Sequence, residues 1–426
     1  MIAHAPDPAA VPVPISFAAC YAGWQRARRG KKPSVNQLGF EARWLDNLQN
    51  LHAALRAGSW QAARTVSFVV THPKTREIHA PDFADRVVHH VLVQRLEKLY
   101  EPIFIHDSYA NRAGKGSHGA VDRLQAFMRQ RANMPCDANV PSTATVRRGS
   151  GWYLQLDVHN FFNSIHRPTL YAMLCKRLSQ AQKRGQLLAK HALALRSLCH
   201  KLLASRVAEH VRNPARAALV PPHKRLCNAQ RGCGLPVGNL TSQFFANMYL
   251  HALDQFVKHT LKVRHYVRYV DDFVLLASSA EQLQDWQARI EAFLHETLRL
   301  KLKEGAVLQP CVQGIDFLGY RVFAQHRTVR PRVVRHCRAK LAQWQRQHAK
   351  TGRVRAQDFA QLQALLGSYW GHFSHANSVR LRFSLFAHMP WLHQYFSLMP
   401  DASLVVNMPA RWQVLRRRAV RQLFDF

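Results

Sequence analysis

Two adjacent carboxylates between apolar segments are the strongest chemical signal in this chain. Tyr269-Val270-Asp271-Asp272 separates two short runs of β-branched and aromatic side chains. Such runs predict two strands joined by a tight turn. Like charges a few Å apart among buried strands repel each other, and a divalent cation would relieve that repulsion. The pair alone is also compatible with an ordinary hairpin that has a solvated acidic turn, so its context must decide.

A third carboxylate, Asp157, ends an alternating apolar segment that begins at Trp152. Three carboxylates at strand ends form the minimum set for phosphoryl transfer by two Mg²⁺ ions about 3.5–4 Å apart. Oxygen ligands suit Mg²⁺, and Mn²⁺ is the alternative. We expect Asp157 and Asp271 to bridge the ions and Asp272 to be a secondary or orienting ligand. The expected metal contacts are Asp157, Val158, Asp271 and Asp272.

The charge balance indicates a polyanionic partner. The chain has 426 residues, of which 47% are hydrophobic, and its 60 Lys+Arg against 25 Asp+Glu give a formal net charge of +35. That apolar content is sufficient for a large core and excludes a disordered polyelectrolyte. The basic excess extends along the whole sequence, which is typical of proteins that bind nucleic acid. Acids are scarce in such a chain, so their clustering at a turn favours a functional role.

The sequence shows no sign of secretion or of membrane insertion. The first fourteen residues lack a basic start followed by an apolar core, and no run of about 18 apolar residues occurs. The eight cysteines contain no Cys-x-x-Cys pair, which favours reduced thiols. We therefore expect a cytoplasmic protein that has no membrane partner.

Hydrophobic periodicity predicts a mixture of helices and strands around these acids. A helical extension is expected over residues 1–65, with its periodic part at 16–60. The further expected elements are strands at 66–70 and 152–158, helices at 85–100, 168–211, 242–262 and 280–298, a strand at 314–323 and a basic helical region from 330 onward.

Taken together, these motifs resemble the reverse transcriptases, which are RNA-directed DNA polymerases. Residues 156–165 resemble the first catalytic motif of that family, and residues 269–272 resemble its YxDD motif. The resemblance implies an α+β, right-hand polymerase fold with fingers, a palm containing an antiparallel sheet, and a helical thumb. We expect fingers and palm over residues 66–325, and a basic helical thumb and C-terminal tail over 326–426.

The same resemblance implies roles for further residues. Phe162, five residues after Asp157, would be the aromatic gate that excludes a 2′-hydroxyl. Lys74 and Arg76 would hold the incoming triphosphate, for which a guanidinium is well suited. Arg112 and Lys115 would contact the template, although solvated surface charges are an equal alternative. The other residues expected to contact nucleic acid are Tyr269, Arg416, Arg417 and Arg418.

One segment separates subfamilies. The chain reads Val237-Gly238-Asn239-Leu240-Thr241-Ser242-Gln243 where most bacterial relatives resemble one another in a QGxxxSP motif. This VGxxxSQ form resembles enzymes of diversity-generating retroelements, which copy a template RNA with frequent errors at adenines. Val237, Gly238 and Gln243 would then lie at the nucleotide. Val237 offers an apolar wall in place of an amide, so the geometry of the base pair would be checked less strictly.

The resemblance also implies partners and leaves other functions open. The expected partners are template RNA, the cDNA/RNA hybrid, dNTPs and a small basic accessory protein. A lysine that protonates pyrophosphate in relatives has no clear counterpart here, and Lys303 is the candidate substitute. The alternatives are a group II intron-type enzyme, a phage-defence reverse transcriptase, and an RNA-binding protein on a polymerase fold.

Overall fold

The structure is a computed structural model that describes residues 12–30, 33–63, 65–71, 74–133, 151–205, 210–211, 214–349 and 354–407. The chain divides into two compact units. The first contains Met1–Gly116, Leu154–Leu275 and Ala280–Leu308, and the second contains Ser117–Tyr153, Leu276–Ser279 and Gln309–Phe426. Within the described ranges, no helix is both long enough and apolar enough to cross a bilayer.

The first unit opens with helices, as predicted for residues 16–60. The Ser16 side chain caps α1 (Phe17–Arg28), and Gly58 ends α3 (Trp44–Ala57) at a φ of 72° that suits glycine. The Asp82 side chain caps α4 in the same way. A Cβ on Gly23 of α1 would lie 2.7 Å from Val91 of α4, so these helices touch where a side chain is absent. The elements are α1 (Phe17–Arg28), α2 (Val35–Glu41), α3 (Trp44–Ala57) and α4 (Phe83–Tyr100).

A small sheet follows, with strand order β2-β1-β4. The strands are β1 (Val66–Val70), β2 (Arg76–Ala80) and β4 (His210–Val211). The prediction of helix through residue 211 is wrong at its end, because His210 and Val211 pair in parallel with Val66 and Ser67 of β1. The helices of that region are α7 (Arg167–Lys183) and α8 (Ala189–Ala204), and the short α9 (Pro214–Ala217) follows the strand.

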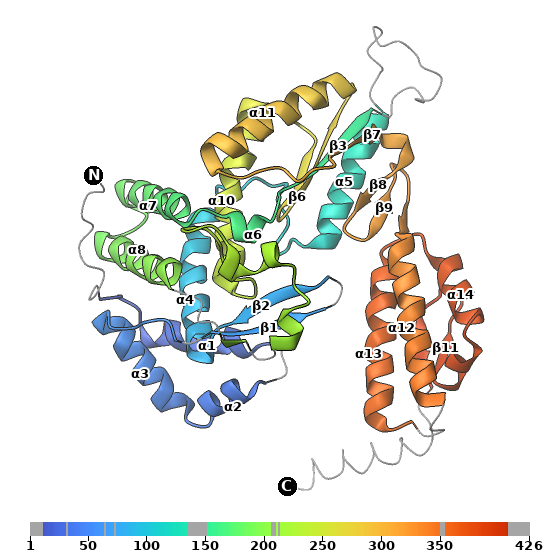
Figure 1. Cartoon of the computed structure of the whole chain (residues 1–426), viewed down its shortest axis with the longest axis horizontal. Helices are drawn as coiled ribbons and strands as arrows, with labels where there is room; N and C mark the ends of the chain where they lie inside the picture. The colour runs from blue at the N-terminus through green and yellow to red at the C-terminus, as the bar shows by residue number, and fades with distance from the viewer. Residues whose placement is uncertain are drawn as a thin grey trace. The chain divides into compact units, whose positions relative to one another are not determined.

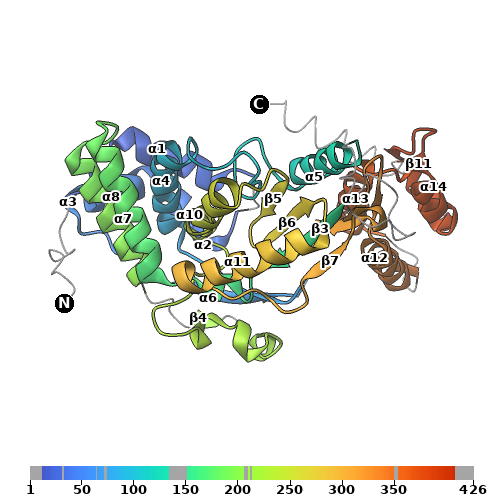
Figure 2. The same cartoon turned by 90° about the horizontal axis from the view of Figure 1, so that it is seen from above.

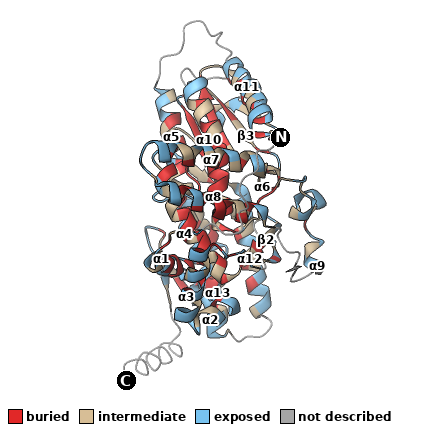
Figure 3. Cartoon of the chain, turned by 90° about the vertical axis from the view of Figure 1, so that its left-hand side faces the viewer, coloured by how far each residue is buried: buried red, intermediate tan, exposed pale blue. Residues whose placement is uncertain are grey.

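The carboxylates belong to a four-stranded sheet of order β5-β6-β3-β7. Its strands are β3 (Trp152–Asp157), β5 (Tyr266–Tyr269), β6 (Asp272–Ala277) and β7 (Val307–Pro310). The helices α10 (Leu240–Gln255) and α11 (Ala280–Leu298) lie beside it (Figures 1 and 2). Buried residues run along α4 and α10 (Figure 3). The predicted strands around the acids and the predicted helix over 280–298 are confirmed.

In the second unit, α5 (Ser117–Ala132) and the sheet β10-β9-β8 accompany three helices, α12 (Pro331–Ala349), α13 (Ala356–Ser374) and α14 (Val379–Ala387). The three helices share a buried apolar core that includes Leu341, Leu366 and Leu385. Two predictions are wrong here. The single strand expected over 314–323 is a hairpin of β8 (Ile315–Phe317) and β9 (Tyr320–Val322), and the strand after it is β10 (Arg327–Val329). The region expected to be helical from residue 330 contains another hairpin, of β11 (Phe396–Leu398) and β12 (Leu404–Val406).

Candidate active site

The acidic motif forms a tight β-hairpin turn in the first unit. Tyr269 of β5 pairs with Asp272 of β6, so Val270 and Asp271 are the two central residues of the turn. Val270 has a φ of 57°, and a positive φ at the first central residue is the pattern of a type II′ turn. A β-branched residue rarely adopts this conformation, which costs about 1–3 kcal/mol. Backbone strain therefore coincides with the predicted catalytic acids.

The surroundings of Asp271 raise the pKa of its carboxyl group. Burial, and then the nearby Asp157 carboxylate, raise the pKa of Asp271 to about 6 from an ordinary 3.8. Asp272 adds to the increase, whereas Arg76 acts in the opposite direction. Asp157 ends β3, which neighbours β6 in the sheet. The fold thus brings together the acids of two strands and the Arg76 side chain predicted to hold triphosphate.

Asp272 has a partner that the sequence reasoning did not identify. The Gln155 side-chain amide donates to Asp272 Oδ1 at 3.0 Å. Gln155 lies two residues before Asp157, and alternate residues of a strand share a face. The sequence therefore could have indicated that Gln155 lies on the same face of β3 as Asp157. The bond ties the Asp272 side chain to β3, and its role as a secondary ligand stays a prediction.

Lys303 lies at Asp157. Its backbone N–H donates to the Asp157 carbonyl at 2.8 Å, and its Nζ is 3.3 Å from Asp157 Oδ2. An antiparallel bridge between Val158 and Leu302 continues this pairing. The two charged side chains are 58% and 41% exposed, so the ion pair contributes only about 0–1 kcal/mol. Lys303 can therefore leave Asp157 at little cost when another cation binds there.

The donor chemistry suits a hard divalent cation. Asp157 and Asp271 present carboxylate oxygens whose mutual repulsion a cation would relieve, and Val158 can offer only its main-chain oxygen. Within the part of the chain that the structure describes, no three His, Cys, Asp or Glu side chains are grouped closely enough to hold a metal ion. Metal binding by all three aspartates accordingly stays a prediction. Within that set, the Asp271 carboxylate interacts more strongly with Asp157 than with Asp272.

The raised pKa predicts how stability depends on pH in the metal-free protein. An acid whose pKa is higher in the folded than in the unfolded state destabilises the fold once it ionises. We therefore expect Asp271 to lower the free energy of unfolding as pH rises from about 4 to about 6. Urea titrations in EDTA, compared with Asp271→Asn, isolate this contribution from that of Asp85, whose pKa burial also raises to about 6. Parallel curves for the two proteins would contradict the expectation.

Phe162 lies in the short helix that follows β3 and contacts the loop before α10. Asn160, at a φ of 45°, precedes the short helix α6 (Phe161–Ser164). The Phe162 carbonyl accepts a hydrogen bond from the Leu235 N–H at 2.8 Å, and its ring lies 5.5 Å from that of Phe161. The half-buried Phe162 side chain is thus fixed next to the loop that carries Val237.

The same loop is tied to the strand that carries Arg76. The His79 N–H donates to the Val237 carbonyl at 2.7 Å. A Cβ on Gly238, whose φ is 118°, would lie 2.9 Å from the Ile78 side chain and 3.0 Å from the His79 carbonyl. Only glycine tolerates both the backbone conformation and this close approach. The contact between Gly238 and β2 therefore sets the distance from Arg76 to the VGxxxSQ segment. Gln243, the last residue of that segment, lies in the first turn of α10.

Other predicted residues lie elsewhere. Arg112 forms an ion pair with Glu101, its side chain is 7% exposed, and it donates to main-chain carbonyls, so its position favours a structural role over contact with a template. Lys115 donates to the His106 carbonyl at 2.8 Å, and the exposed Lys74 precedes β2. The predictions for Arg416, Arg417 and Arg418 fall outside the described residues.

Comparison with known proteins extends these observations. The family model described as reverse transcriptase (RNA-dependent DNA polymerase) matches residues 71–322. Group II intron-encoded protein LtrA of Lactococcus lactis subsp. cremoris is 20% identical in an alignment of 315 residues that covers 58% of this chain and 44% of LtrA. Protein YkfC of Escherichia coli K12 is 23% identical in an alignment of 324 residues that covers 68% of this chain and 74% of YkfC. The chain therefore spans less than half the length of LtrA.

A solved telomerase from Candida albicans, in complex with a fragment of telomeric RNA, is similar at 12% identity and a TM-score of 0.38 over 77% of this chain and 57% of that one. An apo telomerase from Candida tropicalis is similar at 12% identity and a TM-score of 0.37, over 63% and 47%. The family model covers well over half of the 426 residues and contains Asp157, Asp271 and Asp272. The chain belongs to the reverse transcriptase family.

Proposed function

We propose that this chain is an RNA-directed DNA polymerase that extends a primer with dNTPs on template RNA. The observation that carries the proposal is the placement of Asp157, at the end of β3, and Asp271, in the turn before the neighbouring strand β6, within electrostatic reach of each other and of Arg76. Bound Mg²⁺, as two ions, would supply activation of the 3′-hydroxyl and stabilisation of the leaving pyrophosphate. Asp157, Asp271 and the Val158 carbonyl would hold the ions, and Asp272 would orient them.

The protein's own side chains would do the remaining work. Arg76, with Lys74 nearby, would bind the triphosphate, and Phe162 would exclude a ribose 2′-hydroxyl by filling its space. Lys303 lies 3.3 Å from Asp157 and is more than half exposed, so it is available to give a proton to pyrophosphate. Tyr269, Lys115 and the residues Arg416 to Arg418 remain proposed contacts of the cDNA/RNA hybrid.

Primer extension tests the proposal. The purified chain should extend a DNA primer on RNA with dNTPs and Mg²⁺ or Mn²⁺, and the same preparation of Asp271→Asn should not. A chain that binds RNA but extends nothing with either ion would instead be an RNA-binding protein on a polymerase fold. Addition of a small basic accessory protein from the same genome neighbourhood forms the second arm of this experiment.

Within this function, we assign the chain to a diversity-generating retroelement that copies with errors. The Val237 carbonyl bonds to β2 and Gly238 packs on it, so an apolar Val237 side chain occupies a fixed position in the loop that leads to α10. A group II intron-type role is the second candidate, because the group II intron-encoded protein LtrA is similar over 58% of this chain. A phage-defence role is the third, and genome neighbours separate the three.

Replacement of Val237 by glutamine is expected to reduce errors at template adenines about fivefold. The added amide can form one hydrogen bond, which is worth about 1 kcal/mol net, to a correctly shaped base pair. Sequencing the cDNA made by each variant on one RNA, scored by template base, measures the effect. Val237→Ile keeps the apolar wall and serves as the control. An unchanged spectrum for the glutamine variant, or equal error at all four template bases in the unsubstituted protein, would refute the idea.

A further inference from the structure

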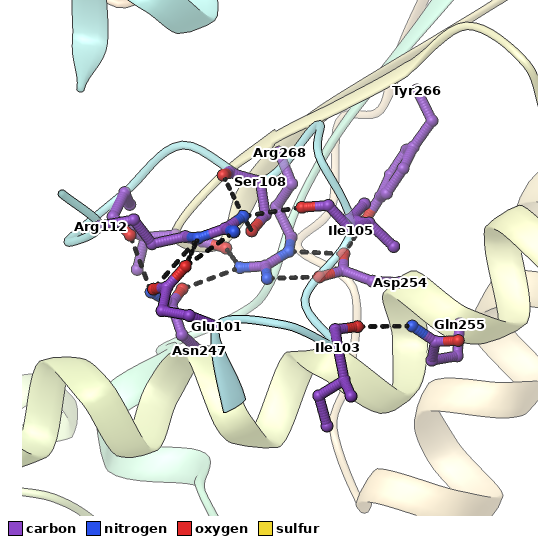
Figure 4. Close-up of polar contacts among 12 residues, drawn as sticks. Glu101, Ile103, Ile105, Ser108, Arg112, Asn247, Asp254, Gln255, Tyr266 and Arg268 are labelled. Atoms are coloured by element: carbon purple, nitrogen blue, oxygen red, sulfur yellow. Dashed lines mark hydrogen bonds and ion pairs between the residues drawn. The ribbon is translucent and has the colours of Figure 1, made fainter. Parts of the chain in front are cut away.

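A buried ion pair lies directly behind the acidic turn. Arg268 of β5 is 1% exposed and Asp254 of α10 is fully buried. Arg268 donates from Nε to Asp254 Oδ1 at 2.7 Å and from Nη2 to Asp254 Oδ2 at 2.6 Å (Figure 4). This two-point contact fixes the plane of the guanidinium as well as its position.

The fixed guanidinium also bonds to the turn itself. Arg268 Nη1 donates to the Val270 carbonyl at 2.8 Å and approaches Asn247 Oδ1 at 3.3 Å. Val270 is the residue with a φ of 57°, and its carbonyl belongs to the peptide that leads into Asp271. The orientation of this peptide determines where the Asp271 side chain points. Arg268 thus acts on the strained residue immediately before the predicted metal ligand.

The network is anchored on both sides. The Tyr266 hydroxyl donates to Asp254 Oδ1 at 2.8 Å, and the Asn247 amide donates to the Ala110 carbonyl at 2.7 Å. The Arg268 backbone bonds to residues 107 and 109, its N–H to the Asp107 carbonyl at 2.9 Å and its carbonyl to the Tyr109 N–H at 3.0 Å.

Arg112 holds the loop that makes those backbone contacts. It donates to the Ile105 carbonyl at 2.7 Å and to the Ser108 carbonyl at 2.9 Å (Figure 4). Ser108 forms a parallel bridge with Arg268. Two arginines therefore hold β5 in place. Arg112 bonds to the loop that pairs with β5, and Arg268 bonds from β5 itself to Asp254 and Val270.

Stability alone does not account for a charged pair at this place. Well-packed apolar side chains stabilise a core as well as a buried ion pair does, or better. Lysine has a single nitrogen, so it cannot bond both Asp254 oxygens in a planar fork and still reach the Val270 carbonyl. The distinctive property of Arg268 is the third donor, and that donor is aimed at the turn.

We propose that Arg268 is a positioning residue for DNA synthesis, which holds the Val270 peptide so that Asp271 meets Asp157 in the geometry for metal binding. Asp254 and Asn247 orient Arg268, and Arg268 itself touches neither substrate nor metal. The proposal rests on the proposed polymerase function and on metal binding by Asp271.

The test compares Arg268→Lys with Tyr266→Phe. The lysine variant keeps the charge but loses the fork, whereas the phenylalanine variant removes one bond to the same Asp254 carboxylate and keeps the bond to Val270. Because misplacement of a reacting group by about 1 Å lowers a rate about a hundredfold, we expect Arg268→Lys to lower kcat by about that factor. KM for dNTP should stay within about twofold, since Arg76 is untouched.

Two readouts do not depend on turnover. Binding of Mn²⁺ to the protein, followed by the loss of the free-ion EPR signal, should weaken at least about tenfold in Arg268→Lys. Hydrogen exchange of the amides at residues 269–272 should accelerate while exchange in α7 stays the same. Tyr266→Phe should keep its Mn²⁺ affinity and its kcat within about twofold, although its melting temperature falls.

The outcomes are distinguishable. If Arg268→Lys melts earlier but keeps the original kcat and Mn²⁺ affinity, Arg268 has only a structural role and the inference is wrong. If the unsubstituted protein fails to extend primers while Arg268→Lys still weakens Mn²⁺ binding, the proposed function fails and the positioning role stands. Should Arg268→Lys not fold, the neutral double variant Arg268→Gln with Asp254→Asn replaces it, and the same criteria apply.

Discussion

Replacing Asp271 by asparagine is expected to reduce primer extension at least about a thousandfold and, at the same time, to stabilise the metal-free protein. A carboxylate that binds a catalytic cation supplies several kcal/mol of transition-state stabilisation, and about 4 kcal/mol corresponds to that factor. The same carboxylate is partly buried and close to Asp157, and its pKa of about 6 means that its charge destabilises the fold at neutral pH. The gain on neutralising it is at most about 3 kcal/mol.

Single-nucleotide extension rates and urea denaturation at pH 7.5 in EDTA measure the two effects on one preparation. Asp285→Asn is a suitable control, since the Asp285 side chain is 62% exposed on α11 and forms a surface ion pair with Arg289. It should change neither quantity appreciably. An Asp271→Asn protein that keeps activity within about tenfold, or that unfolds more easily, would show that this acid is not the strained ligand we describe.

Replacing Phe162 by valine is expected to reduce discrimination against ribonucleotides about a hundredfold, which is typical when a steric feature of a pocket is removed. The ring would no longer fill the space that a 2′-hydroxyl needs. The ratio of kcat/KM for a dNTP to that for the matching rNTP measures the effect, with the dNTP value itself changing much less.

The neighbouring Phe161 provides the matched control. Its side chain is 2% exposed, so Phe161→Leu should destabilise the protein by about 1 kcal/mol through imperfect packing and leave the selectivity ratio as it was. If Phe162→Val and Phe161→Leu change selectivity equally, the gate is assigned to the wrong residue.

The elements that carry the acids were predictable because their signals are local. The runs around Asp271 are β-branched and aromatic, the segment before Asp157 alternates, and α11 has Leu283, Ile290 and Leu294 at helical spacing. The spacing in α11 follows from the burial of one face, whereas the continuous run of β6 follows from burial on both faces, and the structure confirms the strands and the helix.

Two of the errors in the predicted elements have different causes, one a long-range pairing and the other an unusual local turn. Residues 210–211 form a strand because each pairs with a residue of β1. A segment of two residues is too short to show a hydrophobic periodicity. The β8–β9 hairpin turns at Leu318 and Gly319, with φ of 48° and 93°, and leucine in that conformation is uncommon, so its presence did not predict a turn. In the first case tertiary pairing overrides the local pattern, and in the second the turn itself is local but has a residue that does not indicate one.

The Arg268–Asp254 pair was predictable in principle. An arginine inside the apolar run of β5 and an aspartate inside the apolar α10 are each expensive to bury alone, which indicates that they meet. The sequence does not show that the third donor of Arg268 reaches the Val270 carbonyl. That contact depends on how α10 packs on β5, over a separation of 14 residues.

The loop at residues 107–109 also affects how the acidic hairpin folds during translation. It covers the outer side of β5 through the Asp107 and Tyr109 backbones, so the sheet has no free edge there to recruit a second molecule. Both this loop and β3 precede the hairpin in the chain, and only β7 follows it. During translation, the partners on each side of the acidic hairpin are therefore already outside the ribosome when the hairpin emerges. An aggregation-prone strand pair is thus covered as soon as it forms.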